Sequence, residues 1–211
     1  MTTKTAQKWA EILRACGVKP ATASRWAPVF AAEIKSGTFS AGDAELDEFL
    51  GQVLHECGML ERLEENLSYS SAERIRAVWP RRFPAVSDAA QFTRNARALA
   101  NKVYGGRMGN TGPDDGWKYR GRGCIMVTGA DNYRAVGRAL GIDLLAKPDP
   151  LASPAVALRA AVAWWEGRIP DLITADDSIV AETKLVNGGT VGLDHRMQIT
   201  GLARVALAGA A

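Results

Sequence analysis

The chain has 211 residues, with 26 Lys and Arg against 23 Asp and Glu and a formal net charge of +3. Hydrophobic residues make up 47% and charged residues 23% of the composition, which excludes a disordered chain, a fibrous repeat and a disulfide scaffold. A chain of this length buries roughly 70% of its unfolded surface, so it supports a sizeable core. The small positive charge is too weak to predict a nucleic-acid partner.

Cysteine usage indicates a reducing compartment. Cys16, Cys57 and Cys124 cannot all pair with one another, and they are far apart in the sequence. An odd, scattered set favours free thiols, and with only two histidines we expect no metal site and no cofactor. Residues 1–9 have no secretory signal, and no segment approaches the roughly 20 apolar residues that cross a bilayer. We therefore expect a cytoplasmic monomer without membrane insertion.

Apolar residues recur at three-to-four spacing along most of the chain, and Gly or Pro separates the segments, which predicts a mainly α-helical fold. The first helix is expected over residues 5–16, and the second begins at 22 or 24 and ends before Gly37. The remaining predicted helices cover residues 40–57, 70–79, 87–104, 131–140, 154–168, 178–186 and 193–208.

The third predicted helix has the clearest amphipathic pattern. Ser40 is its expected N-cap, with Asp43 as capping-box partner. At 100° per residue its apolar side chains form one stripe. Glu56 lies at the border of that stripe, where a carboxyl group can be partly desolvated yet open onto a cleft. The stripe consists of Leu46, Phe49, Leu50, Val53, Leu54 and Cys57.

Residues 105–123 form a loop rich in Gly and Asp, and residues 124–128 form a short apolar run between glycines that predicts a strand. The fold class is therefore mainly α with a small β element. No phosphate-binding loop or nucleophile elbow is present. A cluster of carboxylates remains as the candidate chemistry, namely Glu56, Glu61, Glu64 and Glu65.

Two carboxylates that flank a bond are the minimum equipment for glycoside hydrolysis. Inverting enzymes hold them about 6.5–9.5 Å apart, whereas Glu56 and Glu65 on one continuous helix would be about 13.5 Å apart. The pair therefore requires the helix to end near Gly58, where the chain turns back. Glu61 and Glu64 remain alternatives for the second carboxylate, and each of these residues could equally lie on a solvated helix face.

Four segments, in this order along the chain, resemble glycoside hydrolase family 19, which contains plant-type chitinases and phage endolysins. They are HECG at 55–58, ENLSYS at 65–70, GRGCIMVTG at 121–129 followed by Asn132 and Tyr133, and VNGG at 186–189 followed by Arg196. The family usually has Gln where this chain has Met126. The short loops resemble the endolysin branch. The resemblance implies a lysozyme-like helical fold with the β element beside the active-site cleft.

The resemblance also implies site roles. Glu56 matches the general acid, Glu65 the general base, and Thr128 the residue that helps to hold the attacking water. Asn187 and Arg196 match positions that bind sugar or support the carboxylates. The other expected substrate-binding residues are Tyr69, Trp117, Tyr119, Asn132 and Tyr133, although aromatic side chains of this kind also commonly pack in a core.

The resulting hypothesis is an endolysin that hydrolyses the β-1,4 glycan strands of peptidoglycan with inversion. It would be one catalytic domain over residues 1–211, with residues 1–37 as an N-terminal helical extension, residues 40–208 as the family-19-like core, and no wall-binding module. It would accumulate in the host cytoplasm and reach the wall through a membrane pore. The alternatives are a chitinase that acts on N-acetylglucosamine oligomers, a lytic transglycosylase, and a non-catalytic glycan-binding protein.

Overall fold

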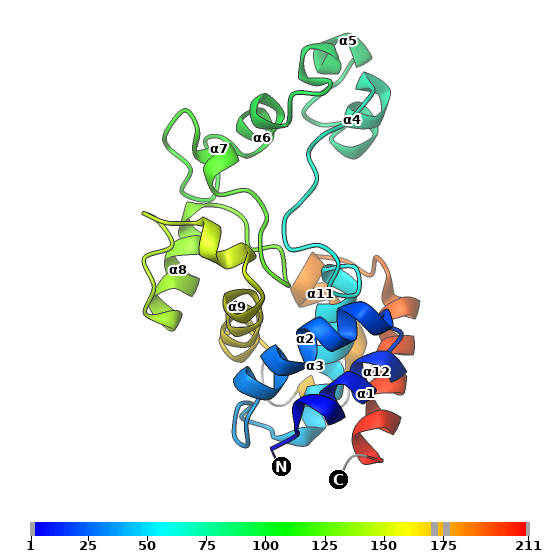
Figure 1. The fold of residues 1–211 in the computed structure, drawn as a ribbon. Coiled ribbons are helices and arrows are strands. Elements are labelled where there is room, and N and C mark those ends of the chain that lie inside the picture. Colours follow the sequence, from blue (N-terminus) through cyan, green and yellow to red (C-terminus); the bar gives the residue numbers. More distant parts are fainter. Residues whose placement is uncertain (1–2, 170–172, 175–177, 210–211) are drawn as a thin grey trace. The chain divides into compact units, whose positions relative to one another are not determined.

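The computed structural model describes residues 3–169, 173–174 and 178–209, and the chain divides into two compact units. Both units are built from helices (Figure 1), which confirms the mainly α fold class. Unit 1 comprises Met1–Leu63, Gly123–Met126 and Pro150–Ala211, and unit 2 comprises Glu64–Arg122 and Val127–Asp149.

The helices of unit 1 gather around α3, which lies against α12 and α11, while α1 packs on α2 and α12, and α2 on α9. Trp9, Trp26 and Phe30 of the first two helices are buried in the same core as Phe49 and Trp165. The segment expected as an N-terminal extension therefore supplies core side chains. The helices are α1 (Ala6–Ala15), α2 (Pro20–Glu33), α3 (Asp43–Glu56), α9 (Pro154–Glu166), α11 (Ile179–Asn187) and α12 (Leu193–Ala208); η2 (Asp149–Ala152) precedes α9.

Each of the six members of the predicted apolar stripe is 0% exposed, but α3 is not amphipathic in its surroundings, because Glu45, Glu48 and Gln52 are also buried. The predicted start of the helix was wrong. α3 begins at Asp43 with Gly42 in the N-cap position, and the backbone N–H of Ser40 donates instead to the carboxylate of Glu166. Similarly, α2 begins at Pro20, because proline is pre-organised for the first helical position.

Unit 2 has a smaller core made of Ile75, Phe83, Ala89, Leu99 and Val103. Its helices are shorter, and α6 lies beside α7 (Figure 1). They are α4 (Ala72–Val78), α5 (Val86–Ala89), the 3-10 helix η1 (Ala90–Phe92), α6 (Ala96–Tyr104), α7 (Asp115–Lys118) and α8 (Ala130–Leu140).

Three expectations in unit 2 need correction. The continuous helix over 87–104 is interrupted because Arg94 adopts a left-handed φ of 57° and Asn95 caps a new helix, α6. The helix predicted over 70–79 is shorter, since α4 begins at Ala72 and Ser71 caps it by accepting a bond from the backbone N–H of Arg74. The loop 105–123 contains the short helix α7.

The predicted strand over 124–128 is also wrong. Its residues form a turn in which Met126 has a φ of 52°, so an extended run cannot form. Among the described residues, the β structure is limited to two isolated bridges, Glu64 with Arg122 and Arg122 with Val127. No helix in the described ranges is both long and apolar enough to cross a membrane.

The contact of α3 with α12 depends on Gly51. A Cβ atom at this position would lie 2.0 Å from Thr200 Oγ1 and 3.1 Å from the Arg196 carbonyl oxygen. We expect Gly51→Ala to lower the free energy of unfolding by about 1–3 kcal/mol, because the two helices would have to separate. Urea denaturation measures this change.

The matched control is Gly201→Ala on α12, where an added Cβ meets no heavy atom within 4 Å. Alanine favours an exposed helix position over glycine by about 0.5–1 kcal/mol, so this variant is expected to be slightly stabilised. Equal effects of the two substitutions would contradict the close approach at Gly51.

Buried Glu45 makes the stability of unit 1 depend on pH. Its side chain accepts hydrogen bonds from Trp165 and from the backbone N–H of Ala41. Burial, with the charge of Glu166, raises the pKa of Glu45 from 4.5 to about 7. A carboxyl with a raised pKa favours the folded state below about pH 4.5, and this contribution is lost as the pH rises toward 7.

We therefore expect Glu45→Gln to remove part of the decline in stability between pH 4.5 and 7, on the order of 1–3 kcal/mol. Thermal melts of both proteins across this range measure the difference. Parallel pH profiles for the two proteins would contradict the prediction.

Candidate active site

Glu56 is the last residue of α3 and is held by a buried arginine from α12. The Arg196 guanidinium is 1% exposed and donates to Glu56 Oε1 and, at 2.6 Å, to Gln52 Oε1. Gln52 Nε2 donates in turn to Thr183 Oγ1 of α11 at 3.0 Å. Three helices of unit 1 thus orient one carboxylate, which remains 20% exposed.

The two histidines of the chain pair beside this carboxylate. The Nδ1 atoms of His55 and His195 lie 2.9 Å apart. Burial, followed by the positive charge of Arg196, lowers the pKa of His55, so the ring is neutral at neutral pH and can share a single N–H with His195. A Cβ at Gly192 would collide with the His55 ring. The pair links α3 to α12 directly beside Glu56.

The chain reverses direction directly after Glu56. Gly58, Met59 and Leu60 have φ values of 57°, 61° and 66°, all in the left-handed region. Helix α3 therefore ends close to Gly58, as the sequence predicted. The next carboxylate, Glu61, accepts a 2.6 Å hydrogen bond from Thr22 Oγ1 within unit 1.

Glu65 lies at the start of unit 2, directly after Glu64, and makes three hydrogen bonds. Its backbone N–H donates to the Gly121 carbonyl at 3.0 Å, while the Gly121 N–H donates to Glu65 Oε1 at 2.5 Å. The hydroxyl of Tyr104 donates to Oε2 at 2.7 Å. Burial and the charge of Glu65 raise the pKa of Tyr104, so this hydroxyl remains a donor over the working pH range.

Thr128 lies next to Glu65 in unit 2. A Cβ at Gly121 would be 3.3 Å from both Glu65 Oε1 and Thr128 Oγ1, so the two side chains border the same small space above the glycine. A side chain at position 121 would fill that space. The structure therefore brings together the predicted base and the hydroxyl expected to help hold a water.

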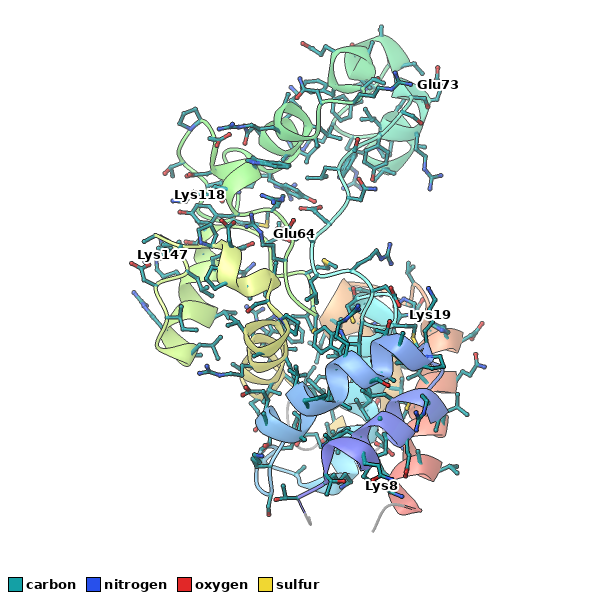
Figure 2. All side chains as sticks on the ribbon, viewed as in Figure 1. Lys8, Lys19, Glu64, Glu73, Lys118 and Lys147 are labelled. Atoms are coloured by element: carbon teal, nitrogen blue, oxygen red, sulfur yellow. The ribbon has the colours of Figure 1, made fainter. Side chains whose placement is uncertain are left out.

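Glu64 makes different contacts from those of Glu65. Figure 2 labels Glu64 and Lys118, which both belong to unit 2. Arg122 and Arg120 donate to its carboxylate at 2.6 and 3.0 Å. Arg122 is 1% exposed and also donates to the Lys118 carbonyl and to Asp149. Burial opposes ionisation of Glu64, but the two arginines outweigh it and lower its pKa. Glu64 neutralises a buried cation, and Glu61 is bound to Thr22, so Glu65 is the best placed of the three for catalysis.

Two of the tyrosines expected to bind sugar lie in the interior of unit 2. Tyr133 is 0% exposed and Tyr119 is 6% exposed, with their ring centroids 5.3 Å apart. The hydroxyl of Tyr133 donates to the Arg120 carbonyl, and that of Tyr119 to the Leu145 carbonyl. Burial raises the pKa of Tyr133 to about 12. These rings have no open face for a sugar, so they support the site from behind.

The other expected substrate contacts are more accessible. Trp117 is half-buried, and one ring face is covered by the Arg120 guanidinium, 3.9 Å from the ring centroid. Tyr69 is half-buried, and its pKa is raised by burial and by the charge of Glu65, which places it near the base. Asn132 donates to the Thr128 carbonyl at 2.8 Å, so it also shapes the backbone next to Thr128.

Asn187 and Arg196 differ in burial. Asn187 is exposed and braces the turn after α11, donating to the Val191 carbonyl and accepting from the Gly189 N–H. Arg196 is enclosed and engages Glu56 and Gln52. Of the two possible roles, Arg196 therefore has the geometry to support a carboxylate, whereas the exposed Asn187 amide is engaged in holding the turn.

Sequence reasoning missed Tyr104 and Gln52. Tyr104 was treated only as the end of a helix, and nothing in its spacing from Glu65 indicates contact across 39 residues. Gln52 had a usable signal, because it lies four residues before Glu56 on the same helix. Among the described residues, no group of three or more His, Cys, Asp or Glu side chains could hold a metal ion.

Comparison with known proteins places these residues in a family context. Residues 86–185 match a family model described as chitinase class I. A protein of Haemophilus influenzae, described as containing a glycosyl hydrolase family 19 domain, is 36% identical over 155 residues, which cover 72% of this chain and 74% of that protein. An endochitinase of Arabidopsis thaliana is 40% identical over 75 residues, which cover 35% of this chain but only 26% of the plant enzyme.

Two solved structures share the fold. Chitinase C from Streptomyces griseus superposes with a TM-score of 0.58 at 20% identity, over 94% of this chain and 91% of that one. A bacterial family 19 chitinase gives a TM-score of 0.50 at 20% identity, over 96% and 95% of the two chains. At this identity the likeness supports the helical fold and not the choice of substrate.

The bond from Tyr104 to Glu65 can be tested by Tyr104→Phe, which removes one oxygen and keeps the ring. We expect kcat on a glycan substrate to fall about tenfold, because Glu65 loses an orienting donor. KM should change less than twofold. Steady-state kinetics with a parallel thermal melt measures both effects; an unchanged kcat would show that the hydroxyl does not orient the base.

Proposed function

The chain belongs to glycoside hydrolase family 19 and is a glycosidase, and from this premise we propose that it hydrolyses the β-1,4 glycan backbone of bacterial peptidoglycan with inversion of configuration. The proposal assigns the acid to Glu56 and the base to Glu65. The observation that carries it is the pair of differently supported carboxylates, Glu56 on a buried arginine and Glu65 on a hydroxyl and a backbone N–H. Inverting hydrolysis needs two such groups with separate tasks.

In the proposed reaction, Glu56 donates a proton to the leaving glycosidic oxygen as the bond to the anomeric carbon breaks. Glu65 removes a proton from a water that attacks the same carbon from the opposite face. The Thr128 hydroxyl and the Glu65 carboxylate border the position proposed for that water. Glu56 loses one proton and Glu65 gains one, so proton exchange with solvent returns both carboxyl groups to their starting states.

Arg196 serves the acid by stabilising the carboxylate that remains after proton donation. Gln52 gives Arg196 a second acceptor at 2.6 Å. The guanidinium can therefore keep its place while Glu56 takes up a proton.

Peptidoglycan is proposed over chitin because the chain has short segments between its helices and a positive charge suited to an acidic polymer. In this proposal the protein acts as a phage endolysin, a monomer that is stored in the host cytoplasm and released to the wall. The buried free thiols of Cys16, Cys57 and Cys124 are compatible with synthesis in a reducing compartment.

Chitin hydrolysis is the second candidate, and the names of the relatives favour it. The plant relative is an endochitinase, and the Streptomyces protein is a chitinase. The chemistry would be the same, and only the substituents recognised on the sugar would differ.

The test compares purified peptidoglycan with colloidal chitin. We expect soluble reducing ends from peptidoglycan, with an initial α-anomer visible by NMR, and little release from chitin. Glu56→Gln should lower kcat by about 10²–10⁴-fold, because the general acid is lost. The protein should stay folded but melt at a lower temperature, because buried Arg196 loses its anionic partner. Gln52→Ala tests the anchor of Arg196 and should cost less.

Other outcomes point elsewhere. Activity on chitin alone selects the chitinase, and anhydro-sugar products select a lytic transglycosylase. Full activity of Glu56→Gln would overturn the assignment of the acid, and binding without any product would identify a glycan-binding protein.

A further inference from the structure

The net positive charge of the chain resides in unit 2. This unit has 14 Lys and Arg against 9 Asp and Glu, a net charge of +5, whereas unit 1 has 12 against 14, a net charge of −2. Within unit 2 the excess is concentrated in residues 72–107, which contain eight basic and two acidic residues. One of the two acidic residues is Glu73 of α4, labelled in Figure 2. The net charge of +3 for the whole chain therefore includes a strongly basic segment at residues 72–107.

A cavity of about 530 Å³ lies in the basic segment. The chain turns sharply after α4, because Pro80 cannot continue a helix and the N–H groups of Arg82 and Phe83 donate to the Trp79 carbonyl at 2.9 and 3.1 Å. The cavity has the volume of a small-molecule site. Its lining consists of Val78, Trp79, Pro80, Arg81, Arg82 and Arg107.

The three arginines of this cavity have no acidic partner among the described residues. No ion pair or side-chain hydrogen bond engages Arg81, Arg82 or Arg107 there. Four other arginines of unit 2 do form ion pairs, as Arg97 does with Asp114 at 2.6 Å and Arg134 with Asp131 at 2.5 Å. Three guanidinium groups around one space repel one another, so the arrangement favours an anion between them.

The cavity connects to the proposed base through aromatic contacts within unit 2. The rings of Trp79 and Tyr69 meet edge to face at 5.4 Å. Tyr69 lies near enough to Glu65 for its pKa to be raised by that carboxylate. A glycan held at Glu65 would therefore have the arginines beyond Tyr69 and Trp79, where a substituent on a neighbouring sugar could reach them.

We propose that the cavity bounded by Trp79, Arg81, Arg82 and Arg107 binds the free carboxylates of the peptide stems of peptidoglycan. Guanidinium groups match carboxylates with paired hydrogen bonds, and Trp79 offers an apolar face to the aliphatic part of a peptide. The lactyl carboxyl of the sugar is consumed in the amide bond to the stem, so the free carboxylates belong to the peptide. The inference rests on the proposed function, and it identifies the part of the polymer that is recognised.

Chitin has no carboxylate, so the cavity would act as a specificity determinant. It would lower KM for peptidoglycan and leave kcat unchanged, because it lies away from the reacting bond. Raising the salt concentration should raise the KM for peptidoglycan, since these arginines are exposed to solvent and their charges are screened.

The test uses native peptidoglycan and the same material after carbodiimide amidation, which neutralises the carboxylates. For the natural protein we expect KM to be about tenfold lower on native material, with equal kcat. For Arg81→Gln/Arg82→Gln we expect one high KM on both substrates and the natural kcat. The matched control is Arg138→Gln/Lys147→Gln, which removes the same charge from exposed positions of unit 2 outside the cavity, and it should behave like the natural protein.

Each alternative result is distinct. If the natural protein cleaves neither substrate, the proposed function fails and the cavity proposal with it. If it cleaves native peptidoglycan and the arginine variant keeps its low KM, the cavity proposal alone is overturned. An equal loss in the control assigns the effect to overall charge and also overturns it. A loss of binding to phosphatidylglycerol vesicles, with KM for peptidoglycan unchanged, assigns the arginines to a lipid surface instead.

Discussion

The buried guanidinium of Arg196 is the constraint on which the arrangement of unit 1 depends. A cation that is 1% exposed destabilises a fold unless it is paired and hydrogen-bonded. Glu56 and Gln52 of α3 provide that compensation, and the close contact at Gly51 brings α12 near enough for it to reach them. The same bonds that satisfy the arginine fix the direction of Glu56. The stability of the helix pair and the position of Glu56 therefore depend on the same bonds.

A second buried guanidinium organises unit 2. Arg122 contacts Glu64, the Lys118 carbonyl, Tyr133 and Asp149, and its backbone pairs with Val127. These bonds hold the segment around Gly121, whose N–H supports Glu65. Unit 2 has a small apolar core, so polar contacts carry much of its local order. In unit 1 the buried Arg196 orients Glu56. In unit 2 the segment that Arg122 holds supplies the Gly121 N–H that orients Glu65.

How far the sequence predicts this structure depends on the range of the interactions. Helix periodicity located α1, α3, α9 and α12, because their apolar stripes face a core. It missed the break at Arg94 and the turn over residues 123–126, where unusual φ values depend on surrounding contacts. Tyr104 escaped notice because its bond to Glu65 joins positions 39 residues apart.

The predicted site residues also divide into those that local motifs indicate and those whose surroundings depend on distant segments. Local motifs indicated Glu56, Glu65 and Thr128, and the structure places Thr128 beside Glu65. Burial could not be read from these motifs, because it depends on segments distant in the sequence. Tyr133 of a matched segment and Tyr119 of the Gly-rich loop were expected as sugar contacts but lie in the interior. Arg196 was expected as a contact or a support and has the geometry of a support.

The turn after Glu56 illustrates how local strain is balanced. A non-glycine residue in the left-handed region costs roughly 1–2 kcal/mol, and Met59 and Leu60 both adopt it directly after Gly58. The strain is offset by a 2.7 Å bond from the Met59 N–H to the Leu54 carbonyl and by burial of Leu60, which is 2% exposed. Cys57 contributes as well, since its Sγ accepts from the Leu60 N–H at 3.3 Å and donates to the Val53 carbonyl.

The Cys57 thiol thus caps the strained turn and is not available as a nucleophile. A larger residue at position 57 would have no room, because this side chain is 0% exposed. The turn ends α3 at Glu56, so the carboxylate stands at a helix end and not on a continuous helix face. The position of Glu56 at a helix end therefore depends on backbone strain, which a buried sulfur and a buried leucine sustain.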